Sequence, residues 1–395
     1  MIHYLSVTNY HSIREETVLD LRIPKTSPDY ERFRPSKVKP DIRLPSVVVL
    51  MGPNGSGKTT LLRAITTIVR IACNPWRSQE IPIKTVVPFF SSAAWNKPSR
   101  FCIEFEANWS PGSSSRLFRY EVSTNADQIL YEAFYHFPKG RLRRIFERGR
   151  PGEPVYVSRD LGITPKDNRL KAVRKDTSVI GTLAMLNVPL VMEITEKLDH
   201  MLAATNIVYH QNWMLPIEAV VELFVQYPDI KKRVIQEIQR NDIAIKDIRI
   251  AGNGTGEEEV LFEHRGLDTP VPLFGESGGT KRMFYLLPQI YIALNNGVAS
   301  VIDEIDGDLH VDIVRQILQR FQSRETNRHN AQLFVTSHNV GLLDDIEKEE
   351  LFIVEKGEDG GTCVHGVQEI TGLRRDIRLY PRYRSGALGG LPDLA

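Results

Sequence analysis

The chain has 395 residues, of which 42% are hydrophobic and 25% charged, as in ordinary folded proteins with a sizeable core. Its 50 lysines and arginines balance 49 aspartates and glutamates, leaving a net charge of +1. That balance excludes a protein that binds nucleic acid or membranes through its overall charge, so any basic surface must be local.

The cysteines and the apolar runs indicate where the protein works. Cys73, Cys102 and Cys363 lie far apart and form neither a zinc-binding spacing nor a disulfide framework. No apolar run approaches the ~20 residues of a membrane span. The first residues also lack the basic start and the long apolar core of a signal peptide. We therefore expect a cytoplasmic protein without a membrane partner.

Residues 1–146 combine strand patterns with one strong helix pattern. Predicted strands cover residues 2–8, 17–22, 46–50, 101–107, 117–122, 129–135 and 142–146, and a predicted helix covers 61–69. Period-two alternation on both sides of residues 111–113 predicts a β-hairpin. The Pro- and Lys-rich stretch 24–45 is expected to be a loop before the strand at 46–50.

Residues 147–245 differ, because their apolar residues recur with helical spacing. Helices are predicted at 190–203 and 217–238, the second broken near Pro228. No heptad pattern persists over several repeats, so a long coiled coil is not expected. This part is interpreted as a mainly helical insertion.

The α/β pattern returns in residues 246–395, which complete the division into three parts. Strands are predicted at 248–250, 260–264, 299–302, 332–336 and 351–354, and helices at 279–296 and 311–322. The helix at 279–296 is expected to kink at Pro288 and to end at Gly297.

Residues 52–59, Gly-Pro-Asn-Gly-Ser-Gly-Lys-Thr, form a phosphate-binding loop between a predicted strand and a predicted helix. Backbone N–H groups of such a loop converge on phosphate oxygens, and the helix N-terminus adds partial positive charge. Lys58 can reach the β- and γ-phosphates, and the Thr59 hydroxyl can bind Mg²⁺. The alternative is a Gly-rich turn that matches by chance, which the flanking strand and helix disfavour. The nucleotide-binding residues are expected to be Asn54, Gly55, Ser56, Gly57, Lys58, Thr59 and Thr60.

Asp303 and Glu304 directly follow the apolar strand at 299–302. Asp303 is expected to hold Mg²⁺, and Glu304 to activate the water that attacks the γ-phosphate. An acidic pair alone also fits a helix N-cap, but its place downstream of a phosphate-binding loop favours catalysis.

Three weaker motifs accompany these residues. Ser277, Gly278 and Gly279 open a helix and would make a second anion site from backbone N–H groups, although alone they fit a Gly-rich cap better. His338 ends a strand and could hold the γ-phosphate, or simply cap the strand. The loop 305–310, with Asp306, would by itself be a solvated turn.

Together and in this order, these motifs resemble the ABC-type ATPase heads of the SMC, RecF and OLD group. The chain is most similar to stand-alone prokaryotic AAA-family ATPases of the abortive-infection type, such as the RloA and AbiL proteins. Besides the motifs above, residues 7–14, 276–282 and 383–392 carry the resemblance. It implies an α/β fold: a P-loop NTPase whose ABC-type head has a mixed sheet, an antiparallel β subdomain and a helical insertion.

The resemblance also implies a homodimer or higher homo-oligomer in which two chains sandwich two ATP molecules with Mg²⁺. Ser277, Gly278 and Gly279 of one chain would cap the γ-phosphate held by Lys58 and Thr59 of the other. Asp306 would lie across the dimer interface, and His338 would sense the γ-phosphate by donating a hydrogen bond to it.

The sequence departs from this family pattern in three places. Transporter heads have Leu-Ser-Gly-Gly-Gln, whereas here Glu276 precedes the serine and Thr280 follows the glycines. No clear Q-loop glutamine is present, and Gln79 is a weak candidate. Related OLD proteins continue into a Toprim nuclease domain, which this sequence lacks, so a nuclease partner would be a separate polypeptide.

Two basic clusters are candidates for contact with DNA or with an acidic partner protein. One covers residues 139–150, and the other contains Arg374, Arg375, Arg378, Arg382 and Arg384. Either could contact phosphates, but a solvated hairpin and a structural arginine network explain them better.

Four functions fit these patterns unequally. The first is an ATPase sensor and scaffold of an anti-phage defence system, which holds a separate toxic effector and releases it on a phage-encoded trigger. The alternative is an ATP-dependent DNA-repair clamp of the RecF or SMC kind, against which the near-neutral charge argues mildly. A third function is a scaffold that hydrolyses ATP very slowly, against which Glu304 argues. The fourth is a transporter subunit, against which the signature segment, residues 276–282, argues.

Overall fold

The computed structural model describes residues 1–73, 82–110, 112–149, 155–206, 217–252, 258–373 and 378–391. Its centre is a six-stranded mixed sheet with the order β11–β15–β16–β5–β17–β18. The first five strands are parallel and β18 is antiparallel. These strands are β11 (Thr205–Asn206), β15 (Ala299–Ile302), β16 (Gln332–Thr336), β5 (Val47–Met51), β17 (Leu351–Lys356) and β18 (Thr362–Gly366).

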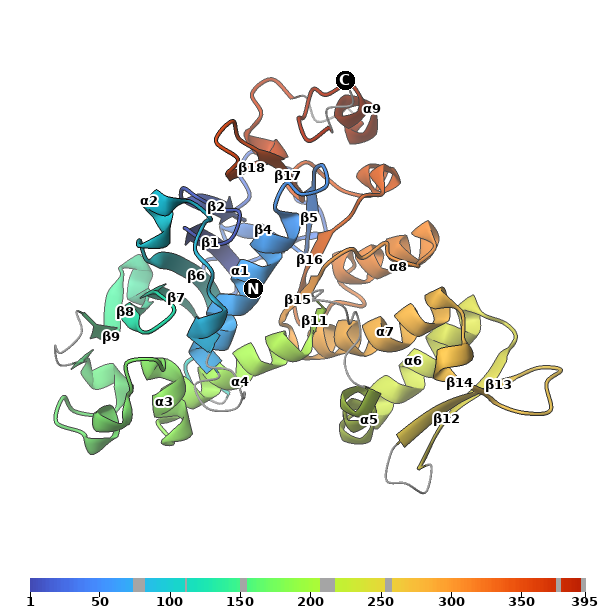
Figure 1. Cartoon of the computed structure of the whole chain (residues 1–395), viewed down its shortest axis with the longest axis horizontal. Coiled ribbons are helices and arrows are strands. Elements are labelled where there is room, and N and C mark those ends of the chain that lie inside the picture. The colour runs from blue at the N-terminus through green and yellow to red at the C-terminus, as the bar shows by residue number, and fades with distance from the viewer. Residues whose placement is uncertain are drawn as a thin grey trace.

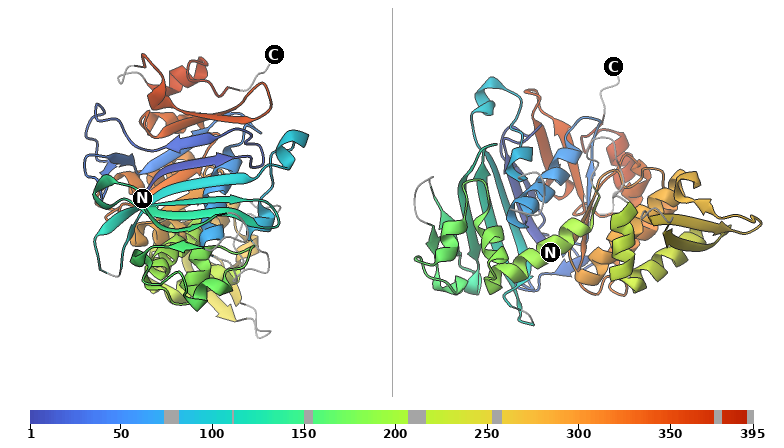
Figure 2. Two further views of the ribbon diagram at one scale, coloured as in Figure 1. Left: turned by 90° about the vertical axis from the view of Figure 1, so that its left-hand side faces the viewer. Right: turned by 60° about the horizontal axis from the view of Figure 1, so that its bottom comes forward.

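A seven-stranded antiparallel sheet stands beside the mixed sheet (Figures 1 and 2). Its order is β10 (Tyr156–Val157), β9 (Arg143–Arg148), β8 (Ile129–His136), β7 (Ser115–Thr124), β6 (Ser99–Asn108), β1 (Ile2–Thr8) and β2 (Thr17–Asp20). The alternating apolar residues of β6 and β7 face the core, as period-two patterns require. The predicted mixed sheet and antiparallel β region are therefore confirmed.

Helix α1 (Lys58–Cys73) lies between the two sheets, in contact with β6 on one side and β15 and β16 on the other (Figure 1). Helix α8 (Val311–Gln322) contacts β5 and β16 from the other side of the mixed sheet. Strand β5 is buried throughout because both of its faces are covered by these layers, which is why its residues are continuously apolar.

The remaining helices are α2 (Ser92–Trp95), α3 (Val179–Met185), α4 (Pro189–Ala203), α5 (Ile217–Gln226), α6 (Pro228–Asn241), α7 (Gly278–Asn296) and α9 (Leu379–Arg384). A small sheet of β12 (Ile245–Gly252), β13 (Glu258–His264) and β14 (Val271–Pro272) lies with α5 and α6 at the end of the molecule away from the antiparallel sheet (Figure 2). Apolar side chains from all three parts share one core cluster. The boundaries at residues 146 and 245 stay predictions.

Pro228 and Gly297 mark helix boundaries as expected. Helix α5 ends at Gln226, Tyr227 is the N-cap of α6, and Pro228 is its first residue, because proline fits the first position of a helix but not its interior. Helix α7 continues through Pro288 and is capped by Gly297 at φ 62°, the left-handed conformation that glycine adopts readily.

Some elements differ from those predicted. The second strand ends at Asp20, and the expected loop 24–45 contains the two-stranded sheet β3 (Phe33–Pro35) and β4 (Arg43–Pro45). Strands this short have no readable period. Helices α3 and α9 and strand β18 have only seven, six and five residues, too few to show a period from which they could be predicted.

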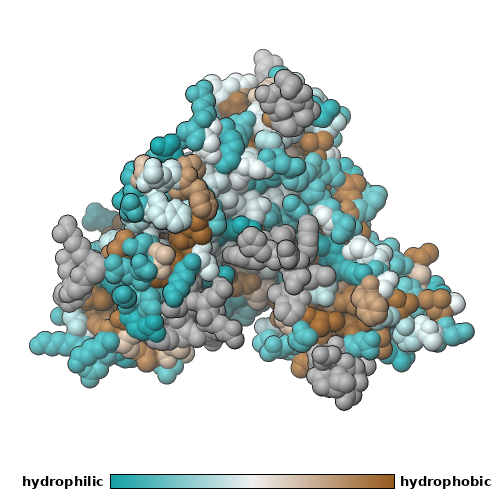
Figure 3. Space-filling view, viewed as in Figure 1, coloured by the Kyte–Doolittle hydropathy of each residue, from teal (hydrophilic) through white to brown (hydrophobic). Residues whose placement is uncertain are grey.

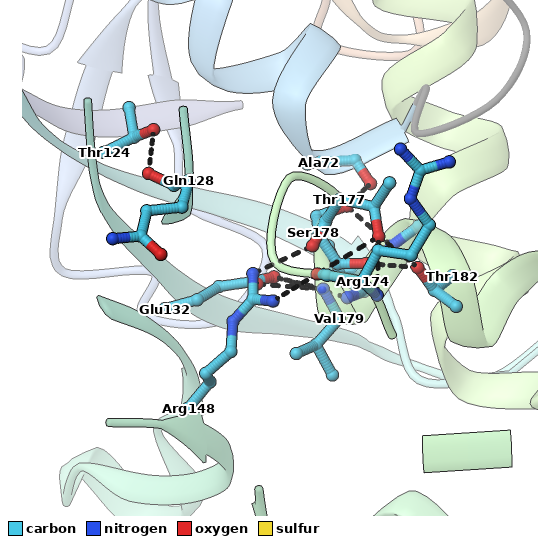
Figure 4. A network of polar contacts seen from close by, with 12 residues as sticks. Ala72, Thr124, Gln128, Glu132, Arg148, Arg174, Thr177, Ser178, Val179 and Thr182 are labelled. Atoms are coloured by element: carbon cyan, nitrogen blue, oxygen red, sulfur yellow. Dashed lines mark hydrogen bonds and ion pairs between the residues drawn. The ribbon is translucent and has the colours of Figure 1, made fainter. Parts of the chain in front are cut away.

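One buried polar network joins the antiparallel sheet to α1 and α3 (Figure 4). Glu132 accepts a hydrogen bond from Arg148 Nη2 at 2.7 Å and from the Val179 main-chain N–H at 2.9 Å. Ser178 caps α3 and donates from Oγ to the carbonyl of Ala72, near the end of α1, at 3.2 Å. The carboxylate satisfies N–H groups that the first turn of α3 leaves unpaired.

Among the described residues, no single helix combines the length and apolar composition needed to cross a membrane. The pair α3 and α4 reaches them only jointly, with a bend of 106° between the two helices.

Candidate ATPase site

The phosphate-binding loop runs from the end of β5 to the start of α1 and depends on glycine at two points. A Cβ atom on Gly52 would lie 2.0 Å from the carbonyl oxygen of Val354, and one on Gly57 would lie 2.1 Å from Thr362 Oγ1. Gly57 also has φ +111°, which side chains rarely tolerate. The β17–β18 hairpin therefore packs directly on the loop.

Lys58 lies inside this loop. Its Nζ donates to the carbonyls of Gly52 and Pro53, each at 2.9 Å. Burial lowers the pKa of the Lys58 ammonium, and Asp303 and two further carboxylates partly offset that effect. The Ser56 Oγ is buried without a protein partner among the described residues. A glycine cradle with a buried cation and an unpaired hydroxyl fits a phosphate chain.

Asp303 follows β15 and is buried beside the loop. Its Oδ1 accepts hydrogen bonds from Thr59 Oγ1 at 3.1 Å and from Thr336 Oγ1 at 2.6 Å. These hydroxyl and carboxylate oxygens fit Mg²⁺, which prefers oxygen ligands and keeps several waters and phosphate oxygens in its shell. No larger group of His, Cys, Asp and Glu side chains within the described ranges could hold a metal ion.

Glu304 stands in a left-handed turn, with φ 48°. Its main-chain N–H donates to Thr336 Oγ1 at 2.6 Å, so one threonine hydroxyl holds both acidic residues. Glutamate in this conformation costs free energy, and such strained residues cluster at functional sites.

Arg282 fixes the same turn from the signature helix α7, a role that no sequence pattern indicated. Its Nη2 donates to the carbonyls of Asp303 at 3.2 Å and Glu304 at 3.1 Å, and Nη1 contacts Asn206 Oδ1 at 3.4 Å. Burial lowers the pKa of Arg282, and the acids around it, Asp308 foremost, counter that effect. The guanidinium thus links α7 mechanically to the acidic pair.

His338 and Asp306 contact each other within one chain. The main-chain N–H of His338 donates to Asp306 Oδ2 at 3.1 Å, and the other carboxylate oxygen is buried without a protein partner among the described residues. The imidazole of His338 is exposed. The predicted position of Asp306 across a dimer interface stays a prediction.

Ser277 caps α7 and faces solvent. Its Oγ accepts from the Thr280 main-chain N–H at 3.1 Å and bonds to Thr280 Oγ1 at 2.8 Å. Glu276, the departure from the transporter pattern, is buried and bonds to His264 Nε2 at 2.7 Å. Gly278 and Gly279 pack on Asp308 of the same chain. The structure thus gathers Lys58, Thr59, Asp303, Glu304, Asp306 and His338, whereas the Ser277–Gly279 segment lies against Asp308.

The turn at residues 7–14 supplies a further contact to the loop. Ser12 Oγ donates to Thr60 Oγ1 at 3.1 Å and accepts from Thr362 Oγ1 at 2.8 Å, and Thr362 Oγ1 also contacts the carbonyl of Ser56 at 2.8 Å. The resemblance to the ATPase heads predicted a strand and turn at residues 7–14. The sequence did not indicate that Thr362 would contact this turn.

Three arginines in the described part of the first basic cluster form ion pairs within the chain. Arg143 pairs with Asp160 at 3.0 Å and Arg144 with Glu147 at 2.6 Å, and Arg148 belongs to the network of Figure 4. Because Arg143 and Arg144 are also exposed, these ion pairs agree with the interpretation of this cluster as a solvated hairpin. Arg374, Arg375 and the Q-loop candidate Gln79 lie outside the described residues.

The solved structures that match this chain include three SMC heads, and the match with each of them covers 92% of this chain. The first is an Smc head bound to the C-terminal winged-helix domain of ScpA (14% identity, 96% of that chain, TM-score 0.47). The second is the SMC head domain from Thermotoga maritima (14%, 98%, 0.41). The third is an Smc head with an extended coiled coil bound to the C-terminal domain of ScpA, derived from Pyrococcus furiosus (15%, 95%, 0.40). At these values the likeness says nothing about ligands or partners.

No curated protein matches the sequence. One family model does, described as AAA domain, putative AbiEii toxin, type IV toxin–antitoxin system, and it covers residues 47–344. The match confirms the resemblance to AAA-family ATPases of the Abi type. Because it spans more than half of the chain, from the strand before the phosphate-binding loop to beyond His338, the chain belongs to this family of AAA domains.

Proposed function

We propose that this chain hydrolyses ATP with Mg²⁺, in composite sites formed by two copies. The observation that carries the proposal is the convergence of Lys58, Thr59 and Asp303 beside a turn that holds Glu304. Lys58 would neutralise charge on the transferred phosphoryl group, and Thr59 with Asp303 would hold Mg²⁺, which stabilises the phosphate charge when bound. Glu304 would orient the attacking water and accept its proton.

The signature supports a second copy as the partner. Ser277 and Gly278 are exposed, and Phe274, three residues before Ser277, is 81% exposed. Apolar surface gathers over the part of the molecule that contains α5, α6 and β12–β14 (Figure 3), where Leu267 and Ile243 are exposed as well. Large exposed apolar side chains next to an anion-binding helix start favour a protein interface.

The test is the Glu304→Gln variant, compared with wild type. Glutamine keeps the shape and the main-chain bonds of Glu304 but cannot accept the proton, so ATP hydrolysis should fall about 100- to 10,000-fold. ATP binding should survive, and the variant should accumulate as a nucleotide-bound dimer in light scattering. Hydrolysis at the wild-type rate would show that Glu304 is not the base.

We further propose that the ATPase serves an anti-phage, abortive-infection system as a sensor and scaffold for a separate toxic effector, such as a Toprim-type nuclease. The family description, a putative AbiEii toxin of a type IV toxin–antitoxin system, supports this role. Plaque assays with the native gene neighbourhood test it: wild type should protect and Glu304→Gln should not. ATP-dependent DNA binding with a steep salt dependence, without protection, would instead indicate the RecF- or SMC-like clamp.

A further inference from the structure

A polar cavity of about 460 Å³ lies among α6, α7, α8 and the loop that follows α8. Its lining includes Leu294 and Asn295, just before β15, and Glu325, Thr326, Arg328 and His329, before β16. The acidic pair and His338 instead follow the C-terminal ends of these parallel strands. The cavity therefore lies at the opposite edge of the sheet from the ATPase site. Tyr291, in its wall, is about 21 Å along α7 from Ser277 at the usual helical rise.

Cations dominate this cavity, because the lining holds four arginines and two glutamates. One glutamate, Glu237, is already satisfied. Arg320 Nη2 donates to its two oxygens at 2.6 and 2.5 Å, and the Tyr291 hydroxyl donates to it at 3.0 Å. Burial and Glu237 raise the pKa of Tyr291 to about 12, so the phenol stays a donor at neutral pH. Arg320 is the arginine that pairs with Glu237, so the other three arginines are not neutralised by this carboxylate.

Three of the four arginines present donors to the cavity. Arg240 is exposed near the end of α6 and has no protein partner among the described residues. Arg328 uses only Nε, which donates to the Glu325 carbonyl at 3.0 Å. Arg233 makes one long hydrogen bond of 3.4 Å to Asn295 Oδ1, and its guanidinium lies 5.9 Å from the centre of the Tyr291 ring. Guanidinium groups with free Nη atoms bind phosphate oxygens in pairs.

We propose that this cavity binds a small molecule that carries phosphate groups, held by Arg240, Arg328 and Arg233. Its volume lies in the range of small-molecule sites, and Tyr291 and Leu294 give it an apolar wall. A nucleic-acid backbone would need an extended basic track, whereas these exposed arginines line a single cavity in a chain of net charge +1. The site goes beyond the proposed ATPase and does not depend on it.

The test measures pyrophosphate binding by calorimetry in the Lys58→Ala background, which weakens anion binding at the phosphate loop. Adding Arg240→Gln and Arg328→Gln should weaken binding at least tenfold, since two charge-assisted contacts are lost. The matched control is Arg324→Gln, an exposed arginine of the same loop that lines a different cavity. It should change the Kd less than twofold.

Circular dichroism checks that all variants fold, and tungstate in wild-type crystals, located by anomalous scattering, should lie in the cavity. Equal pyrophosphate binding with and without the two arginines would overturn the proposal. So would equal losses with Arg324→Gln, tungstate bound elsewhere only, or no saturable binding with a Kd below about 1 mM.

Discussion

Arg282 donates from Nη2 to the main-chain oxygen of Glu304 at 3.1 Å. The donor belongs to the helix that starts with the signature serine, and the acceptor belongs to the residue proposed to activate water. Under the proposed function, this guanidinium would join the helix expected to contact the partner's nucleotide to the residue expected to act on the chain's own nucleotide.

Replacing Arg282 with glutamine should lower kcat about tenfold or more, because the loss of charged hydrogen bonds leaves the Glu304 turn free to relax. KM and ATP affinity should change little, since Lys58 and the loop are untouched. Steady-state kinetics and fluorescent-nucleotide titration separate the two effects.

The matched control is Arg34→Gln. Arg34 is also buried, and its Nη2 donates to the carbonyls of Phe321 and Gln322 at the end of α8, at 3.3 and 3.1 Å. Both variants should lose stability, but only Arg282→Gln should lose kcat. Equal loss of kcat in both would reduce the role of Arg282 to general stability.

Mixing two inactive variants tests whether ATP sites are shared between chains. Lys58→Ala should not bind ATP, and Ser277→Arg should bind ATP but block closure at the exposed start of α7. A mixed dimer contains one site with an intact loop and an intact signature, so hydrolysis should recover to as much as a quarter of wild type, roughly, if half the dimers are mixed. Recovery no greater than either variant alone would argue for independent sites.

Gly57→Ala should damage the phosphate loop far more than Gly55→Ala. Both glycines have positive φ, but a Cβ on Gly57 would collide with Thr362 Oγ1 at 2.1 Å, whereas nothing lies within 4 Å of one on Gly55. Gly55→Ala should lower the free energy of unfolding by about 1–2 kcal/mol. Gly57→Ala should cost clearly more in urea unfolding, and equal costs would contradict the packing of β18 on the loop.

The pH dependence of stability should contain a contribution from Glu350. Burial raises the pKa of Glu350 to about 7 from its ordinary 4.5, against the lowering effect of Arg32. Between these values the folded chain binds a proton that the unfolded chain has lost, so stability falls as pH rises from about 5 to 7. The contribution is on the order of 2–3 kcal/mol.

Urea unfolding of wild type and Glu350→Gln at pH 5, 6, 7 and 8 checks this sign. The wild-type free energy minus that of the variant should decrease up to about pH 7 and then level off. A constant difference would mean that Glu350 is charged throughout.

The sequence was sufficient to predict the elements that have a periodic apolar pattern or a recognisable motif. The hairpin of β6 and β7, the break at Pro228 and the cap at Gly297 follow from local patterns, and the phosphate loop and acidic pair from motif and position. Arg282 could not be predicted, because its acceptors are main-chain oxygens that exist in every residue. The contacts of Ser12 with Thr362 join positions 350 apart in the chain, and such pairs depend on sheet order rather than on local pattern.

The support of Gly52 by Val354 and of Gly57 by Thr362 bears on how the protein can be shortened. The family match ends at residue 344, and a fragment cut there would keep the phosphate loop, signature, acidic pair and His338. It would lack Val354 and Thr362, which pack against the loop, and strand β17, which pairs with β5. A minimal ATPase fragment must therefore extend through β18, at least to Gly366.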